Sequence, residues 1–225
     1  MRKELVQRRL LLCGIIGIVS KKQVVSRLVN GLETLEYRGY DSSGVATISD
    51  SNITFTKSIG KLISLKEKLQ KKPLKGYVGI GHTRWATHGE PTEVNAHPHV
   101  TKNVAVVHNG IIENFAEFKD DFLKKGISFN SQTDTEVIAK LVEEKISREK
   151  CKPLEAVRLA VEKLQGSFAL CFIFRGIEDL MIATRRGSPL AIGFGEGENF
   201  VSSDATSLSM FSEKICYLEE GDLPR

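Results

Sequence analysis

The chain has 225 residues, 41% of them hydrophobic and 27% charged, which is typical of an ordinary soluble globular domain with one sizeable core. Its formal net charge of +4 comes from 32 basic and 28 acidic residues without long runs of one sign, which argues against nucleic acid as a partner. The four cysteines form no CxxC pair, so we expect free thiols in a reducing compartment and neither a disulfide framework nor a structural zinc site.

The N-terminal segment superficially resembles a secretion signal, because basic residues precede an apolar run over 10–19. That run contains two glycines, has no small-residue cleavage pattern after it and continues into an amphipathic segment. A bacterial lipoprotein signal would place a small residue before the cysteine, where this chain has Leu12. No later stretch reaches the roughly 20 apolar residues that span a bilayer. We therefore expect a cytoplasmic protein without a membrane partner.

Short apolar segments with turn-sized gaps between several of them predict antiparallel strands. The expected strands cover residues 15–19, 44–48, 53–57, 77–81, 104–108, 168–174, 180–184, 190–194, 200–202 and 215–218. Apolar residues at three-to-four spacing predict helices over 24–35, 137–142 and 154–164. Pro153 fits the first turn of the last of these helices. Strands and helices in runs, without strict alternation, predict an α+β fold in which packed sheets are covered by helices.

Cys13 opens the apolar run Cys-Gly-Ile-Ile-Gly-Ile-Val, which places a thiol followed by glycine at the head of a strand, where it can act as a nucleophile. A free thiol with a pKa near 8.5 is only a few per cent thiolate at neutral pH, so it needs a base. No histidine is assigned to that role by the sequence, but the α-amine of an N-terminal Cys13 could take the proton. The alternative is a small buried hydrophobic residue that opens a strand.

The segment 79–88 leaves an expected strand and enters a loop rich in polar side chains. Arg84 can hold a carboxylate through two parallel hydrogen bonds, and Trp85 beside it can shield that pair from water. The alternative interpretation is a surface arginine stacked on a tryptophan.

Two further loops carry candidate groups. Asn109 and Gly110 follow the expected strand 104–108. A side-chain amide and a backbone N–H that point to the same place would form an oxyanion hole. On spacing alone, however, a plain Asn-Gly turn is favoured. Asp134 stands at the head of an expected helix, where capping is favoured for the residue taken alone. A carboxylate there could instead hold an ammonium group. Taken with Arg84, these groups describe a site for an amino-acid amide beside a thiol.

Other motifs give weaker signals. The histidines at 82, 88, 97, 99 and 108 lack a metal-ligand pattern such as HExxH, so we expect no metal site. The glycines over 193–197 have the wrong spacing for a dinucleotide fingerprint and predict a hairpin turn. We expect no cofactor.

Several blocks of the sequence together resemble a known family. They are CGI at 13–15, LEYRGYDSSG at 35–44, HTRWATHGEP at 82–91, NAHPH at 95–99 and HNGIIEN at 108–114. These blocks are similar to the class II glutamine amidotransferase (glutaminase) domain of the glucosamine-6-phosphate synthases, the isomerising glutamine–fructose-6-phosphate aminotransferases. The resemblance runs from residue 13 to about residue 222. It implies an N-terminal-nucleophile (Ntn) hydrolase fold, a four-layer sandwich of two antiparallel sheets between helical layers.

The resemblance also implies roles for individual residues. The thiol of an N-terminal Cys13 would attack the side-chain amide of L-glutamine to give a γ-glutamyl thioester and ammonia, and water would then release glutamate. The resemblance implies that Asn109 and the backbone N–H of Gly110 form the oxyanion hole. Arg84, with help from Thr87 and His88, would bind the α-carboxylate of glutamine, and Asp134 would bind its α-ammonium. Trp85 would belong to a loop that closes over the substrate.

The chain departs from the family at both ends. Members of the family carry a sugar-isomerase half that binds fructose 6-phosphate and receives the ammonia. The resemblance implies a homodimer formed through that half, which we expect to be absent here. At the other end, residues 1–12 precede the glutaminase domain expected over 13–225. We expect translation to start at Leu12, which a UUG or CUG codon would encode, or else a cleaved propeptide. If neither holds, the chain would be a catalytically silent glutamine-binding domain or fragment.

Overall fold

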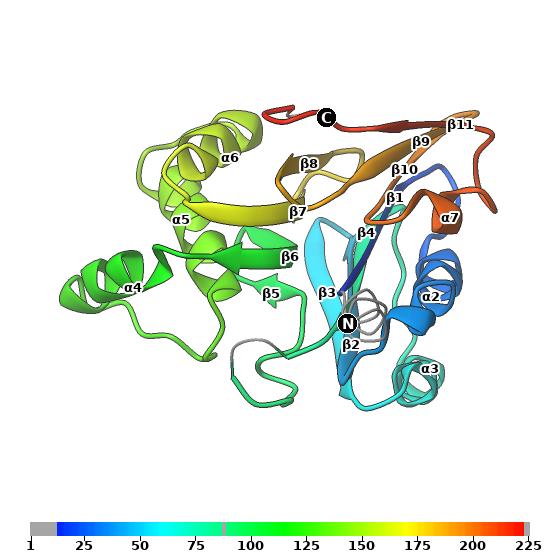
Figure 1. Ribbon diagram of the computed structural model, residues 1–225, viewed down its shortest axis with the longest axis horizontal. Helices are drawn as coiled ribbons and strands as arrows, with labels where there is room; N and C mark the ends of the chain where they lie inside the picture. The colour runs from blue at the N-terminus through cyan, green and yellow to red at the C-terminus, as the bar shows by residue number, and fades with distance from the viewer. Residues whose placement is uncertain (1–12, 87–88, 223–225) are drawn as a thin grey trace, which may run out of the picture.

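The computed structural model describes residues 13–86 and 89–222 and shows two antiparallel sheets packed face to face, with helices on the outer face of each sheet (Figure 1). This arrangement gives four layers in the order helix, sheet, sheet, helix. Apolar side chains fill three interfaces: one between the two sheets and one between each sheet and its helices. The predicted α+β four-layer sandwich is confirmed.

The larger sheet has seven strands in the order β11-β9-β10-β1-β4-β2-β3. Its central strand β1 lies between β10 and β4 and is buried on both faces, which explains its unbroken apolar sequence. The bounds are β1 Gly14–Val19, β2 Ser42–Ser49, β3 Asn52–Ile59, β4 Val78–Arg84, β9 Ala191–Gly195, β10 Glu198–Ser202 and β11 Lys214–Tyr217.

The smaller sheet has four strands in the order β5-β6-β7-β8. Strands β6 and β7 pair along their whole length, from Val104 opposite Phe174 to Ile112 opposite Gly166. The bounds are β5 His99–Val100, β6 Val104–Ile112, β7 Gly166–Phe174 and β8 Met181–Arg186. This long pairing makes β6 a rigid support for the residues near its end.

Helices cover the two outer faces as amphipathic elements. The larger sheet is covered by α2 Val25–Glu33, α3 Leu62–Lys71 and α7 Ala205–Leu208, with the short 3-10 helix η1 Glu36–Arg38 following α2. The smaller sheet is covered by α4 Phe115–Lys124, α5 Thr135–Ser147 and α6 Pro153–Val161. Within the described part of the chain, none of the helices has the length and apolar character needed to cross a membrane.

Each expected strand and helix overlaps an observed one, and Pro153 begins α6 as predicted. The hairpin expected at 193–197 joins β9 to β10. The largest boundary errors among the strands are at the ends of β4 and β6, which continue to Arg84 and Ile112, and α5 also extends beyond the expected range. Polar residues end the apolar pattern early in both strands, although these residues keep their ladder pairing and most of their side chains are buried. The sequence pattern did not predict β5, α3, α4 or α7, which are short or largely polar.

Candidate active site

Cys13 lies directly before β1, at the end of the central strand of the larger sheet. The start of the strand is anchored on its neighbour segment, because Ile15 N donates to Ser203 Oγ over 3.0 Å and Ser203 N donates to Ile15 O over 3.1 Å. Gly14 follows the cysteine because a Cβ there would lie 2.6 Å from Thr83 Oγ1 on the paired strand β4. The thiol is therefore presented from a closely packed, well-fixed strand end.

The sulfur of Cys13 contacts the main chain of Trp85. The backbone N–H of Trp85 donates to Sγ over 3.3 Å, and Sγ lies 3.6 Å from the Trp85 oxygen. Burial raises the pKa of the Cys13 thiol, and the Trp85 N–H and the nearby Arg84 charge offset only part of that effect. Among the described residues, no histidine ring is hydrogen-bonded to this sulfur. The thiol thus needs a base other than an adjacent imidazole.

Arg84 is the last residue of β4. The loop that the sequence had suggested for this residue is wrong. Its side chain is buried, with the residue only 3% exposed, and its guanidinium donates to the main-chain oxygens of Glu90 and Gly89 over 3.4 Å each. Burial excludes the alternative of a surface arginine. A strand end holds this charge more rigidly than a loop would.

Asn109 and Gly110 lie within β6, opposite Ala169 and Phe168 of β7, so the expected Asn-Gly turn is wrong. The Asn109 side chain donates from Nδ2 to the main-chain oxygen of Cys13 over 2.8 Å. Gly110 has φ of 120°, and a Cβ there would come within 2.0 Å of Ser167 O. The position therefore requires glycine, because β7 passes too close for a side chain.

Asp134 precedes α5, but its side chain makes no capping hydrogen bond, so the favoured capping interpretation is wrong. The carboxylate instead accepts from the backbone N–H of Ile112, at the end of β6, over 2.8 Å. Asp134 is 5% exposed. This contact ties the start of α5 to the strand that carries Asn109 and Gly110.

These residues meet around one small cavity of about 20 Å³, lined among others by Cys13, Arg84, Trp85, Gly110 and Asp134. The structure thus brings together the predicted nucleophile, cation, carboxylate and glycine from four separate parts of the chain. Asn109 joins them through its bond to Cys13. The predicted residues Thr87 and His88 lie outside the described residues.

Arg38 and Asp41 also support the site, although their sequence context predicted no role for them. Arg38 is 8% exposed, lies 3.4 Å from the Cys13 oxygen through Nη1 and forms an ion pair with Asp204 over 2.7 Å. Asp41 accepts from the backbone N–H of Ala86 over 2.6 Å and so holds the segment after Trp85. Both belong to the block at 35–44 that carried the family resemblance, and that block was the available signal.

Behind Asn109, four of the five histidines form a buried cluster: His82, His97, His99 and His108. The rings of His82 and His97 are 4.2 Å apart between centroids, and those of His97 and His99 are 4.9 Å apart. Burial lowers the pKa of His82 to about 3 and holds the pKa values of His97 and His99 well below the usual range. These three rings are neutral at physiological pH.

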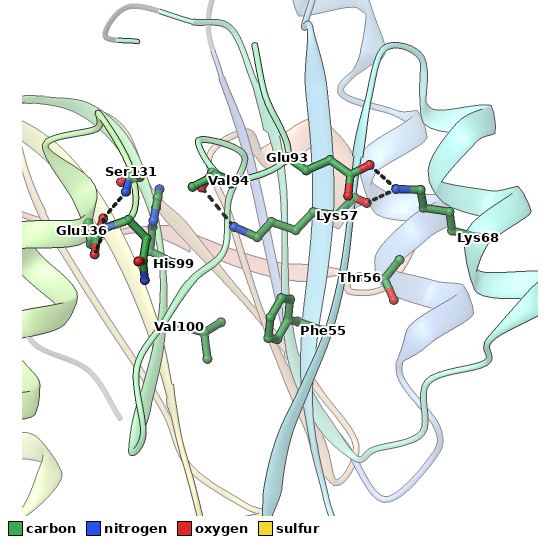
Figure 2. A pocket seen from close by; sticks show the side chains of 11 residues that line it. Phe55, Thr56, Lys57, Lys68, Glu93, Val94, His99, Val100, Ser131 and Glu136 are labelled. Atoms are coloured by element: carbon green, nitrogen blue, oxygen red, sulfur yellow. Dashed lines mark hydrogen bonds and ion pairs between the residues drawn. The ribbon is translucent and has the colours of Figure 1, made fainter. Parts of the chain in front are cut away.

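A larger cavity of about 560 Å³ lies between the edge strands β3 and β5 (Figure 2). Lys57 points across it and donates to the oxygens of Ala96 and Val94, and burial lowers the pKa of Lys57 to about 8. Figure 2 also shows Lys68 paired with Glu93. None of the predicted site residues that the structure describes lines this cavity, whereas the small cavity holds the thiol. Cys13 therefore marks the candidate active site.

The chain is similar in sequence to known proteins. A family model described as a glutamine amidotransferase domain matches residues 82–210. A glutamine–fructose-6-phosphate aminotransferase [isomerizing] of Mesorhizobium japonicum is 53% identical over 94% of this chain and 35% of that protein. Its namesake in Bradyrhizobium diazoefficiens is 54% identical over 94% of this chain and 34% of that protein. The chain thus spans about a third of the length of these relatives.

Two solved structures share the fold. One is described as the allosteric regulatory enzyme of purine biosynthesis and has a TM-score of 0.80 at 24% identity. The match covers 94% of this chain and 46% of the chain of that enzyme. The other is a glutamine phosphoribosylpyrophosphate amidotransferase from B. subtilis and has a TM-score of 0.77 at 22% identity. The match covers 94% of this chain and 48% of the chain of that enzyme. At this identity, the likeness concerns the fold alone.

Proposed function

Because the chain belongs to the glutamine amidotransferase domain family, we propose that Cys13 is the nucleophile that releases ammonia from the side-chain amide of L-glutamine. The observation that carries the proposal is the convergence of a thiol, an amide donor, a buried cation and a buried carboxylate around one cavity. These are the groups needed to activate an amide carbonyl and to hold both charges of an α-amino acid.

In the first step, the thiolate of Cys13 adds to the amide carbon of glutamine, and the electron pair of the carbonyl moves onto its oxygen. Asn109 Nδ2 and the backbone N–H of Gly110 stabilise this oxyanion. The intermediate collapses when the amide nitrogen takes a proton and leaves as ammonia, and a γ-glutamyl thioester remains. Water then adds to the thioester, and glutamate leaves as the thiol is restored. The sum is glutamine plus water to glutamate plus ammonia.

Arg84 and Asp134 are proposed to recognise the two ends of the amino acid. The guanidinium takes the α-carboxylate through two parallel hydrogen bonds, and the carboxylate of Asp134 takes the α-ammonium. Both side chains are buried, which strengthens such contacts and raises the cost of leaving either charge without its counterpart. We assign supporting contacts with the carboxylate to Thr87 and His88.

Glutamine enters only if part of the wall moves, because a cavity of about 20 Å³ has room for about one water molecule. Trp85 is 38% exposed and lies at the outer wall. We propose that the segment containing Trp85 opens for glutamine and closes over it, which keeps the thioester from premature loss.

The proposed base is the α-amine of Cys13, with an unperturbed pKa of about 7.7 to 8. That amine exists only after residues 1–12 are absent, either through a start at Leu12 followed by its removal or through cleavage of a leader. The catalytic domain then comprises residues 13–225. The burial-raised pKa of the thiol makes such a base necessary.

For the whole protein, we propose that the ammonia passes to a sugar-isomerase part and converts fructose 6-phosphate to glucosamine 6-phosphate. Support comes from the aminotransferase names of relatives that are more than half identical over 94% of this chain and almost three times as long. A homodimer would form through that part, in the cytoplasm, where the four described cysteines stay reduced.

A second candidate, a catalytically silent glutamine-binding domain, is favoured by residues 1–12, which would convert the α-amine of Cys13 to an amide. Intact mass and glutamate release, measured on one preparation from the native start region, decide between the two. A mass beginning at Cys13, with glutamate release that Cys13→Ala abolishes, supports the enzyme. A mass beginning at Met1 with glutamine binding but no turnover supports the silent domain. Equal release by Cys13→Ala contradicts the nucleophile.

A further inference from the structure

The buried histidine cluster directly contacts the amide of Asn109. His82 Nε2 lies 2.9 Å from Asn109 Oδ1 and 3.0 Å from the main-chain oxygen of His108. A main-chain oxygen can only accept, so Nε2 of His82 carries a proton. On the other side of the amide, Asn109 Nδ2 faces the oxygen of Cys13, which also only accepts. The orientation of the Asn109 amide is thus fixed from both ends.

The next contact fixes the proton positions on two imidazoles. His82 is neutral, since burial lowers its pKa to about 3, so with Nε2 protonated its Nδ1 has a lone pair. His97 Nδ1 lies 3.1 Å from that Nδ1 and must donate to it. Burial also holds the pKa of His97 well below the usual range, so its Nε2 accepts.

The chain continues to the first residue of α5. Thr135 Oγ1 lies 2.8 Å from His97 Nε2 and 3.4 Å from Asp134 Oδ1, and because His97 Nε2 is the nearer acceptor, the hydroxyl proton is donated to His97. His108 Nδ1, at 2.9 Å from the same hydroxyl, must then donate to the Thr135 oxygen. Every proton therefore points one way, from His108 through Thr135, His97 and His82 to Asn109.

We propose that His82 is a positioning residue for the oxyanion-binding amide of Asn109 and that His97 and Thr135 impose the tautomer that lets His82 donate. The inference rests on the proposed function, because it assigns Asn109 its role in that reaction. It deepens that function by explaining why the amide nitrogen, and not the amide oxygen, faces the developing oxyanion.

The physical reason is that an asparagine amide has a donor and an acceptor of nearly equal size. Without a donor at His82, rotation about the last side-chain bond would let the Asn109 oxygen face the developing oxyanion, which it would repel. Removing an oxyanion donor costs about a hundredfold to a thousandfold in rate. Loss of His82 alone should cost less, because Cys13 O still favours the productive orientation.

The first test needs no substrate. Nitrogen-15 NMR on ¹⁵N-histidine-labelled protein at pH 7 should show His82 neutral and protonated at Nε2, and His97 neutral and protonated at Nδ1. A cluster that merely fills the core imposes no such pair of opposite tautomers. A proton on Nδ1 of His82, or titration of His82 near pH 6.5, overturns the inference whether or not the protein turns over glutamine.

The second test compares two substitutions of similar size. His82→Gln keeps an N–H near the position of Nε2, whereas His82→Leu removes it. We expect kcat for glutamate release to fall about tenfold to a hundredfold in His82→Leu, with KM within about threefold, and to recover most of its value in His82→Gln. Equal kcat in the two folded variants overturns the inference. Where His82→Leu does not fold, His97→Leu against His97→Asn, which keeps the Nδ1 donor, makes the same comparison.

The two tests separate this inference from the proposed function. Opposite tautomers in a wild-type protein that begins at Cys13 but releases no glutamate would contradict the glutaminase and leave the amide orientation established. Glutamate release by a protein whose histidines have other tautomers would support the glutaminase and contradict the proposed role of His82.

Discussion

Asn109 donates from its side-chain amide to the main-chain oxygen of Cys13 over 2.8 Å, although 96 positions separate the two residues. Cys13 adjoins β1 of the seven-stranded sheet, and Asn109 lies in β6 of the four-stranded sheet. The contact therefore spans the interface between the two sheets. The proposed nucleophile and its oxyanion donor meet only because the sheets pack face to face.

This contact predicts the effect of Asn109→Asp, which replaces the amide donor by a carboxylate of the same shape. We expect kcat for glutamate release to fall about a hundredfold to a thousandfold, with KM changed less than about threefold, because the donor acts on the oxyanion. Steady-state kinetics with glutamine checks it. Asn114→Asp is the control, since Asn114 bonds Lys163 O and does not line the cavity that holds Cys13, and it should affect thermal stability and leave kcat unchanged. A small loss of kcat in Asn109→Asp would remove Asn109 from the oxyanion hole.

Arg84→Lys tests carboxylate recognition. Lysine keeps the charge but loses the fork, so one charge-assisted hydrogen bond to the α-carboxylate is lost at a cost of about 1.5–3 kcal/mol. The expected result is a KM for glutamine raised about tenfold to a hundredfold, with a smaller effect on kcat. Arg27→Lys, which weakens a two-bonded pair with Glu198, serves as the control and should leave KM unchanged. An unchanged KM in Arg84→Lys would exclude Arg84 as the carboxylate ligand.

Gly110→Ala tests the close approach of β6 and β7. A Cβ would lie 2.0 Å from Ser167 O at a φ of 120°, so the strands must separate. We expect a loss of at least about 3 kcal/mol, seen as a Tm lower by about 6–12 °C in calorimetry. Gly126→Ala is the matched control, because its φ is 75° but no described atom lies within 4 Å of the added carbon; it should cost about 1–2 kcal/mol. Equal losses would mean that backbone conformation, and not crowding, requires glycine at 110.

The buried histidines predict how stability depends on pH. The pKa of His82 is about 3 in the folded protein against about 6.5 when unfolded, so the unfolded state binds more protons between these values. The free energy of unfolding therefore falls as pH drops below about 6.5. His82→Gln removes one such proton and should reduce the slope by up to about 1.4 kcal/mol per pH unit between pH 4 and 6.

Urea unfolding at pH 5, 6 and 7 measures that slope. Phe122→Leu, a substitution in a fully buried position without a titrating group, should lower the stability at all three pH values and leave the slope as in the wild type. An unchanged slope in His82→Gln would show that this ring is protonated in the folded protein.

Much of the fold was predictable, because strand and helix patterns are properties of neighbouring residues. The apolar run 14–19 predicts a strand buried on both faces, and β1 is that strand. The helix α3 was missed because only Leu62, Leu65 and Leu69 of its ten residues are buried. This short, largely polar segment forms a helix because it packs against the sheet, and that packing cannot be read from the segment's own sequence.

The candidate site was predicted residue by residue, but three local environments were wrong. Arg84 ends a strand, Asn109 and Gly110 lie within one, and Asp134 bonds Ile112 without capping its helix. In each case a polar or glycine residue near an expected boundary was assigned to the commonest local structure. The pairing of Arg84 with Ser42 of β2, the pairing of β6 with β7 and the contact of Asp134 with β6 decided otherwise.

Most strands and helices, the thiol at the head of a strand and the blocks that identify the family could be recognised from the sequence, because each of these features is encoded in consecutive residues. Two features depend on tertiary packing: which side of the Asn109 amide faces Cys13, and which nitrogen of each clustered histidine donates its hydrogen bond. Those outcomes depend on hydrogen bonds between residues on separate elements, and such bonds exist only after the two sheets and α5 have packed together.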